Sequence, residues 1–155
     1  MSQKIDELNV SPYWKKAFKA FEKAGPLTGL YYENAAELER AERKLVGFNF
    51  SAFIFGVFFY FQKGMFEKGM MILGMGWFHG AILLIIAKIM GGGMHPGAFW
   101  LPIAAIAGVF GSYDYYRHMV HGDRLWESFK TFENPLKLYG FVAAGLAAIL
   151  IVAII

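Results

Sequence analysis

Three polar side chains in the C-terminal half of the sequence could bind a metal ion. Asp114, His118 and His121 stand at positions i, i+4 and i+7, which share one face of a helix. Neutral imidazoles and a carboxylate at that spacing suit zinc or iron. The segment equally fits a helix leaving a membrane, with Tyr and His at headgroup level and Arg117 against phosphates. Because the sequence has no second two-histidine motif, we predict no metal site and no cofactor.

His79 is a further candidate, because an ionisable residue inside a long apolar stretch is either functional or hydrogen-bonded to a neighbouring helix. The sequence has no cysteine, no phosphate-binding glycine loop, no serine nucleophile elbow and no pair of intramembrane carboxylates. We therefore predict a protein that is not an enzyme and has no catalytic residues.

The composition of the chain predicts the kind of structure that positions these residues. Of the 155 residues, 57% are hydrophobic, 18% aromatic and only 17% charged, whereas soluble domains average about 25% charged residues. A soluble chain this small cannot bury so much apolar surface, so the sequence predicts a small all-α membrane protein. The net charge of +3 is modest, and we expect no nucleic-acid partner.

The chain divides into a polar and an apolar part. Residues 1–46 carry 15 of the 27 charged residues and are predicted to form a cytoplasmic helical segment. The membrane part, residues 47–155, contains four apolar stretches: 47–62, 69–90, 96–113 and 139–155. The last three are long enough for transmembrane helices. The first is short, rich in Phe and interrupted by polar residues and glycine.

The positions of Lys and Arg predict that residues 47–62 do not cross the membrane. If they crossed it, nine basic residues would lie inside and six outside. If they return to their own side as a re-entrant or interfacial helix, the ratio becomes fourteen to one, with only Lys88 near the outer face. The sequence thus predicts three spans, a cytoplasmic N-terminus and an outer loop at residues 91–96. A short first span in a thinned bilayer is the alternative.

An amphipathic helix is predicted after the Ser11–Pro12 start signal and is ended by Gly25–Pro26. Its aromatic and basic faces suit an anionic inner leaflet. The aromatic stripe could equally pack on another helix. A second helix is predicted at residues 34–46. The residues predicted to contact lipid are Trp14, Lys15, Lys16, Phe18, Lys19 and Phe21, together with Arg117.

Small residues in the apolar stretches predict close approach between helices. The spacing of Gly76 and Gly80, four residues apart, is also a weak signal for dimerisation, although packing within one protomer explains it equally well. The predicted packing positions are Gly76, Gly80, Gly108, Gly111 and Gly145.

Two stretches resemble a bacterial inner-membrane family known as domain of unknown function 2628. The first is Gly47-Phe-Asn-Phe-Ser-Ala-Phe-Ile-Phe-Gly56, followed by Phe59-Tyr-Phe-Gln-Lys-Gly-Met65. The second is Gly111-Ser-Tyr-Asp-Tyr-Tyr-Arg-His118, similar to the family's later Tyr-Tyr-x-His element. Asp114 departs from the asparagine or arginine usual there. The resemblance implies a small multi-pass inner-membrane protein and no particular activity.

We expect a non-enzymatic protein that acts by binding another membrane component or by self-assembly. Its expected partners are the lipid bilayer and either a membrane protein or further copies of itself. Two alternatives stay open. An immunity protein against a pore-forming toxin would have a toxin gene beside its own. A small channel or transporter would conduct ions in liposomes and lose conductance on His79→Ala.

Overall fold

A computed structural model describes residues 2–154 of the chain. This range is helical apart from short loops and one antiparallel hairpin, in which β1 (Leu27–Thr28) pairs with β2 (Tyr31–Tyr32). The N-terminal part holds α1 (Ser2–Glu7), α2 (Pro12–Ala24), a 3-10 helix η1 (Ala35–Glu37) and α3 (Arg40–Val46). The remainder is built from α4 (Phe50–Phe55), α5 (Val57–Gln62), α6 (Phe66–Met90), α7 (Gly97–Tyr116) and α8 (Pro135–Ile154).

α2 begins and ends where the sequence predicts. Pro12 takes its first position, where no backbone N–H is needed, and Gly25 ends it with a φ of +76°. The second predicted helix, at residues 34–46, is shorter than expected. Glu39 and Glu42 form a reciprocal capping box, so α3 begins only at Arg40.

The Phe-rich stretch folds into two six-residue helices, α4 and α5, with a break between them. Gly56 occupies the break with a φ of +51°. Each helix rises about 9 Å, at 1.5 Å per residue, against a hydrocarbon core about 30 Å thick. The Asn49 side chain accepts a hydrogen bond from the Ala52 N–H and donates one to Ser112 Oγ in α7, both at 2.9 Å. These bonds fix the start of α4 against α7.

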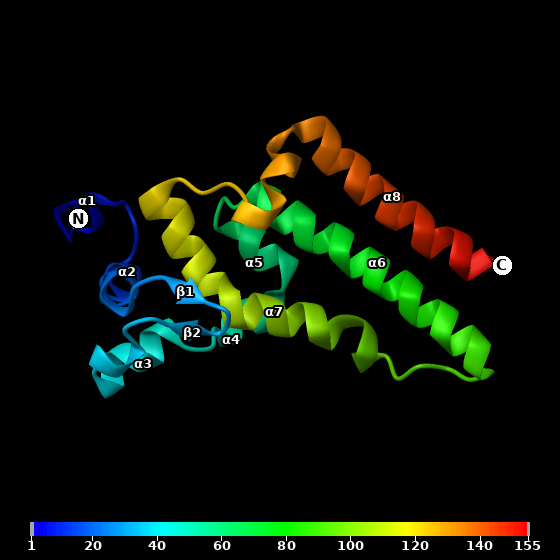
Figure 1. The fold of residues 1–155 in the computed structure, drawn as a ribbon, viewed down its shortest axis with the longest axis horizontal. Coiled ribbons are helices and arrows are strands. Elements are labelled where there is room, and N and C mark those ends of the chain that lie inside the picture. Colours follow the sequence, from blue (N-terminus) through cyan, green and yellow to red (C-terminus); the bar gives the residue numbers. More distant parts are fainter. Residues whose placement is uncertain (1, 155) are drawn as a thin grey trace.

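The three long helices form the other part of the molecule (Figure 1). α6 leads away from the end that holds α1–α3, α7 returns to it, and α8 leads away again. α7 continues into a π-helical turn, η2 (Arg117–His121), and a 3-10 helix, η3 (Glu127–Glu133), precedes α8. α8 packs along α6, so closely that a Cβ at Gly145 would lie 3.0 Å from the Gly74 carbonyl oxygen.

Two helices, α6 and α8, are long and apolar enough to cross a membrane, judged by length and composition. They match two of the three predicted spans. The third, residues 96–113, forms α7, whose second turn contains Pro102 and whose last turns carry Ser112, Tyr113 and Asp114. α7 is not one of the two helices that pass the test of length and composition.

One hydrophobic core joins the N-terminal segment, residues 2–46, to the part of the chain that follows it. Phe18 and Phe21 of α2 are buried against the rings of Tyr115 and Tyr116 at the end of α7. The α2 helix therefore packs directly on the end of a long apolar helix.

Candidate functional site

A buried ion pair lies where α5, α6 and α7 meet. Asp114, near the end of α7, is 2% exposed, and Lys68, in the first turn of α6, is 1% exposed. Lys68 Nζ lies 3.0 Å from Asp114 Oδ1. Tyr60 of α5 donates its hydroxyl to Oδ2 at 2.8 Å, and Trp126 donates Nε1–H to Oδ1 at 2.7 Å. We call these four residues the Asp114 cluster.

The carboxylate of Asp114 is fully engaged within this cluster. It accepts from one cation and two neutral donors, which satisfies the hydrogen-bonding requirement of a buried charge. The Lys68 ammonium also lies 5.7 Å from the Trp126 ring centre, within the range of a cation–π contact. The arrangement holds α5, α6, the end of α7 and the segment after η2 in one place.

A pocket of about 490 Å³ adjoins the Asp114 cluster. α6 contributes Lys68 and Met75, and the segment after η2 contributes Trp126 among others. Ile106, Phe110, Tyr113, Asp114 and Arg117 line it from α7 and η2. It combines a mostly apolar wall with a charged end, the composition typical of ligand sites, and its volume lies in their usual range of about 300–1,000 Å³. We call it the boundary pocket.

η2 places charged groups at the mouth of the boundary pocket. Arg117 and Asp123 form an ion pair at 2.7 Å, with side chains 37% and 30% exposed. π-helical turns occur often at functional sites. Here the wider turn ends at Gly122, whose φ of +77° turns the chain back so that Asp123 meets Arg117.

The predicted metal candidates do not act together. Asp114 belongs to the buried cluster, His118 Nδ1 lies 3.2 Å from the Asp123 carbonyl oxygen, and His121 Nε2 lies 3.3 Å from the Tyr116 hydroxyl. The i, i+4, i+7 face was predicted for an α-helix, and the π-helical turn rotates the two histidines away from it. Within residues 2–154, no group of three or more His, Asp or Glu residues could hold a metal ion.

His79 lies in the middle of α6 and faces α7. Its Nε2 is 3.0 Å from the carbonyl oxygen of Ala98, in the first turn of α7. This is the hydrogen-bonded histidine that the sequence offered as one of two interpretations, and the contact links the middle of α6 to the first turn of α7.

The aromatic residues of α2 occupy a different place from the one predicted. Phe18 and Phe21 are buried in protein, and Trp14 packs edge-on against Tyr115 at 4.8 Å. The prediction that these rings contact lipid headgroups is therefore wrong for Phe18 and Phe21. The tyrosines at the end of α7 supply the apolar partner, as the packing interpretation of the stripe requires.

The lysines of α2 are largely engaged by acidic neighbours. Lys19 pairs with Asp6 of α1 at 2.7 Å, and Lys15 donates to the Asp6 carbonyl oxygen. Lys23 pairs with Glu42 of α3, also at 2.7 Å. Lys16 is exposed. Lipid binding by Lys15, Lys16, Lys19 and Arg117 stays a prediction, on a face whose charge is partly neutralised.

Four of the five predicted packing glycines lie at close helix contacts. A Cβ at Gly80 would meet Ile149 of α8 at 2.9 Å, and one at Gly145 would meet Gly74 of α6. Cβ atoms at Gly108 and Gly111 would collide with Phe48 and with Ala52 of α4, at 2.5 and 2.8 Å. Gly76 differs, because its nearest neighbour, Ile103, lies at 3.7 Å, an ordinary contact.

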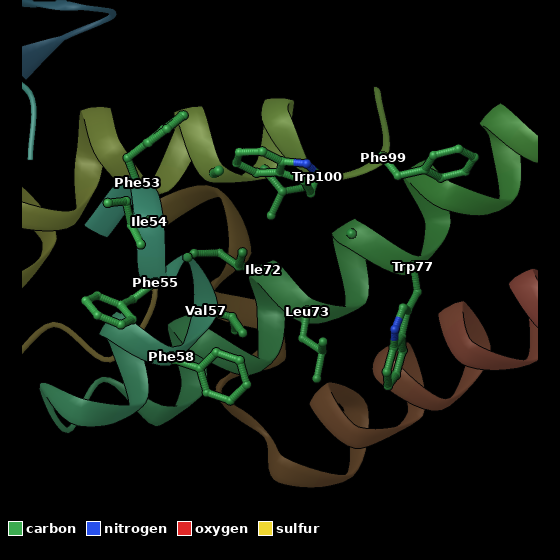
Figure 2. A pocket seen from close by; sticks show the side chains of 14 residues that line it. Phe53, Ile54, Phe55, Val57, Phe58, Ile72, Leu73, Trp77, Phe99 and Trp100 are labelled. Atoms are coloured by element: carbon green, nitrogen blue, oxygen red, sulfur yellow. The ribbon is translucent and has the colours of Figure 1, made fainter. Parts of the chain in front are cut away.

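Gly76 instead lines a second pocket, of about 330 Å³, between α4, α5, α6 and the start of α7. Figure 2 shows that pocket with Phe and Ile side chains of α4 and α5 on one side and Trp77 and Trp100 on the other. Its lining is apolar or aromatic throughout. Without a charged or hydroxyl group it offers no chemistry, so we regard it as part of the apolar surface.

The sequence pattern identifies Asp114 as a candidate site residue but does not identify its partners. Lys68 was counted only as a charge for topology, and Tyr60 and Trp126 were not identified as site residues. The sequence gives a signal for Lys68, which directly precedes a long apolar stretch. If the start of that helix is buried, the cation needs an anionic partner. Separations of 46 and 54 residues from Asp114 hide such contacts from local patterns.

No curated protein and no solved structure matches the chain. A family model described as "Protein of unknown function (DUF2628)" matches residues 13–121, which include the Phe-rich stretch, α6, α7 and η2. The match covers Tyr60, Lys68 and Asp114 but ends before Trp126 and α8. On this match over most of its length, the chain belongs to the DUF2628 family.

Proposed function

We propose that the protein is an integral protein of the bacterial inner membrane that acts by binding another membrane component, and that it catalyses no reaction. The observation that carries the proposal is that the two helices long and apolar enough to cross a membrane, α6 and α8, are mostly exposed. Only 28% of the apolar window of α6 and 17% of that of α8 is buried, although core helices of soluble proteins are mostly buried.

Many of the exposed side chains on these two helices are large and apolar. Ile85 and Ile89 of α6 and Leu150 of α8 are 44%, 81% and 52% exposed. Large exposed apolar surface is unfavourable in water and favourable in hydrocarbon. A lipid environment therefore accounts for it.

In this proposal α7 is the third span and α4–α5 a re-entrant pair. α7 has 20 residues, enough to cross about 30 Å, and it runs back toward the end of the molecule that holds α1–α3. α4 and α5 are each too short to cross. The exposed Phe50, Phe55 and Phe58 on them suit insertion into one leaflet.

The distribution of charge supports a cytoplasmic N-terminus. The end of the molecule that holds α1–α3, η2 and η3 carries fourteen of the fifteen Lys and Arg residues, and Lys88 is at the other end with the loop at residues 91–96. Positive charge is enriched on the cytoplasmic side of membrane proteins.

Binding, rather than catalysis, suits the state of the polar groups. Lys68 and Asp114, the buried charged residues within the described range, pair with each other. The boundary pocket beside them, together with the free face of α8, gives the protein two surfaces on which a membrane component could bind.

The test combines membrane extraction with cross-linking in intact membranes. A photo-reactive residue replaces Phe110 in the boundary pocket or Leu150 on α8, and Tyr31, which is 79% exposed on the hairpin, serves as the control position. We expect the protein to resist alkaline carbonate and to give a discrete adduct from Phe110 or Leu150. Release by carbonate, or adducts from neither position above the Tyr31 control, would contradict the proposal.

A further inference from the structure

The face of α7 that lines the boundary pocket changes character along its length. Ile106 and Phe110 come first, Asp114 follows one turn later, and Arg117 lies at the start of η2. The spacings of four, four and three residues keep these side chains on one side of the helix. The pocket is therefore apolar at one end and charged at the other.

The apolar end lies beside the long helices. Met75 of α6 stands opposite Ile106 and Phe110 of α7 in the lining of this end. In the orientation proposed above, these residues lie at the depth of acyl chains, and Arg117 and Asp123 lie at the depth of headgroups. A molecule that fills the pocket must then be amphiphilic.

The charged end holds nearly balanced charges of both signs. Lys68 and Asp114 pair inside, Arg117 and Asp123 pair at the mouth, and the exposed Glu127 beside them pairs with Lys130 at 2.6 Å. A purely anionic headgroup that engaged Arg117 would leave Asp123 without its cation. A headgroup that carries both a phosphate and an ammonium gives Arg117 a new anionic partner and Asp123 a new cationic partner.

We propose that the boundary pocket binds one zwitterionic phospholipid of the phosphoethanolamine class. Its phosphate pairs with Arg117, its ammonium pairs with Asp123, and one acyl chain lies against Met75, Ile106 and Phe110. The inference rests on the proposed function, because the ligand reaches the pocket only if α6 and α7 lie in a bilayer.

The experiment measures lipid retention by native mass spectrometry of the full chain in mild detergent, with phosphatidylethanolamine and phosphatidylglycerol at equal concentration. We expect phosphatidylethanolamine to be retained about tenfold more, the ratio that corresponds to about 1.4 kcal/mol. Arg117→Gln with Asp123→Asn should remove the preference. Arg124→Gln, which breaks the exposed pair with Glu67 outside the pocket, is the matched control and should keep it.

A single substitution distinguishes a change in lipid preference from simple loss of folding. Asp123→Asn leaves Arg117 unbalanced, so the preference should reverse toward phosphatidylglycerol, a gain that an unfolded variant cannot show. Equal retention of both lipids by the unaltered protein, or an unchanged preference in Asp123→Asn, would overturn the inference. Release of the protein by alkaline carbonate would instead contradict the proposed function, so the two failures are distinguishable.

Discussion

At the scale of single residues, the Asp114 cluster is the most demanding feature of the molecule. A buried charge is expensive unless it is paired and hydrogen-bonded, and Asp114 has both kinds of partner. The pair therefore need not add net stability over an apolar core, but removal of one member leaves the other uncompensated.

We predict that Asp114→Asn and Lys68→Met each lower the free energy of unfolding by about 3–5 kcal/mol, the range found when one partner of a buried ion pair is removed. The double variant should lose less than the sum of the two, because it strands no charge, its asparagine oxygen can still accept from Trp126, and its amide NH2 can donate to the Tyr60 oxygen. Unfolding in detergent micelles, followed by circular dichroism, measures these differences.

The control is the pair between Arg124 and Glu67, because the Arg124 side chain is 53% exposed. Arg124→Gln should cost no more than about 1 kcal/mol, as exposed ion pairs do. Single variants of the Asp114 cluster that cost no more than this control would show that the cluster is not a stabilising element.

His121 provides a prediction about pH. Burial, and then the nearby Arg117 charge, lower the pKa of His121 below its usual value of 6.5. The unfolded chain therefore binds a proton more readily, so this stabilisation is complete above about pH 6.5 and is lost as the pH falls through the lower folded-state pKa. The free energy of unfolding should decrease from pH 7.5 to about 5, and His121→Gln should reduce that decrease. An identical pH dependence in the variant would refute this role.

The residue scale also shows what local patterns cannot predict. Asp114 stands out in the sequence because a carboxylate at the end of an apolar stretch is unusual. A shared face for Asp114, His118 and His121 follows only from α-helical spacing, and the π-helical turn at Arg117–His121 breaks that spacing. Lys68 and Trp126 become partners only through the tertiary fold.

At the scale of elements, the contact between α6 and α8 depends on glycine. Gly145 faces α6, with its Cβ position 3.0 Å from a backbone oxygen, whereas Gly140 on the same helix has no neighbour within 4 Å of that position. We predict that Gly145→Leu separates the two helices and lowers the melting temperature, because backbone cannot move aside as a side chain can. Circular dichroism melts in one detergent give the comparison.

Gly140→Leu is the matched control, since it adds the same side chain to the same helix on an open face. We expect it to melt near the temperature of the unaltered protein. Equal melting temperatures for the two variants would mean that α6 and α8 do not pack as the structure shows.

Helix boundaries were predicted best where strong local signals act. Pro12 and Gly25 bound α2 as the sequence indicates, because both residues act through their own backbone. The helix predicted at residues 34–46 starts late, because the Glu39–Glu42 capping box outcompetes the weaker signal at Asn34. The sequence does not determine what the aromatic face of α2 packs against, because lipid and the end of α7 both offer an apolar contact.

At the scale of the whole molecule, charge and apolar surface are separated along the long helices, as the proposed membrane orientation requires. Every Lys and Arg except Lys88 lies toward the end that holds α1–α3, and α6 and α8 expose apolar faces away from it. The break at Gly56 lets α4 and α5 turn back, so that Lys63 stays at the same end as the N-terminus.

Cysteine labelling tests this claim most directly, because the sequence contains no cysteine of its own. Single variants Lys63→Cys, Lys130→Cys and Gly92→Cys are exposed in intact cells to a thiol reagent that does not cross membranes. We predict labelling of Gly92→Cys in intact cells and of Lys63→Cys and Lys130→Cys only after the membrane is permeabilised. Labelling of Lys63→Cys in intact cells would show that residues 47–62 cross the membrane and would contradict the account.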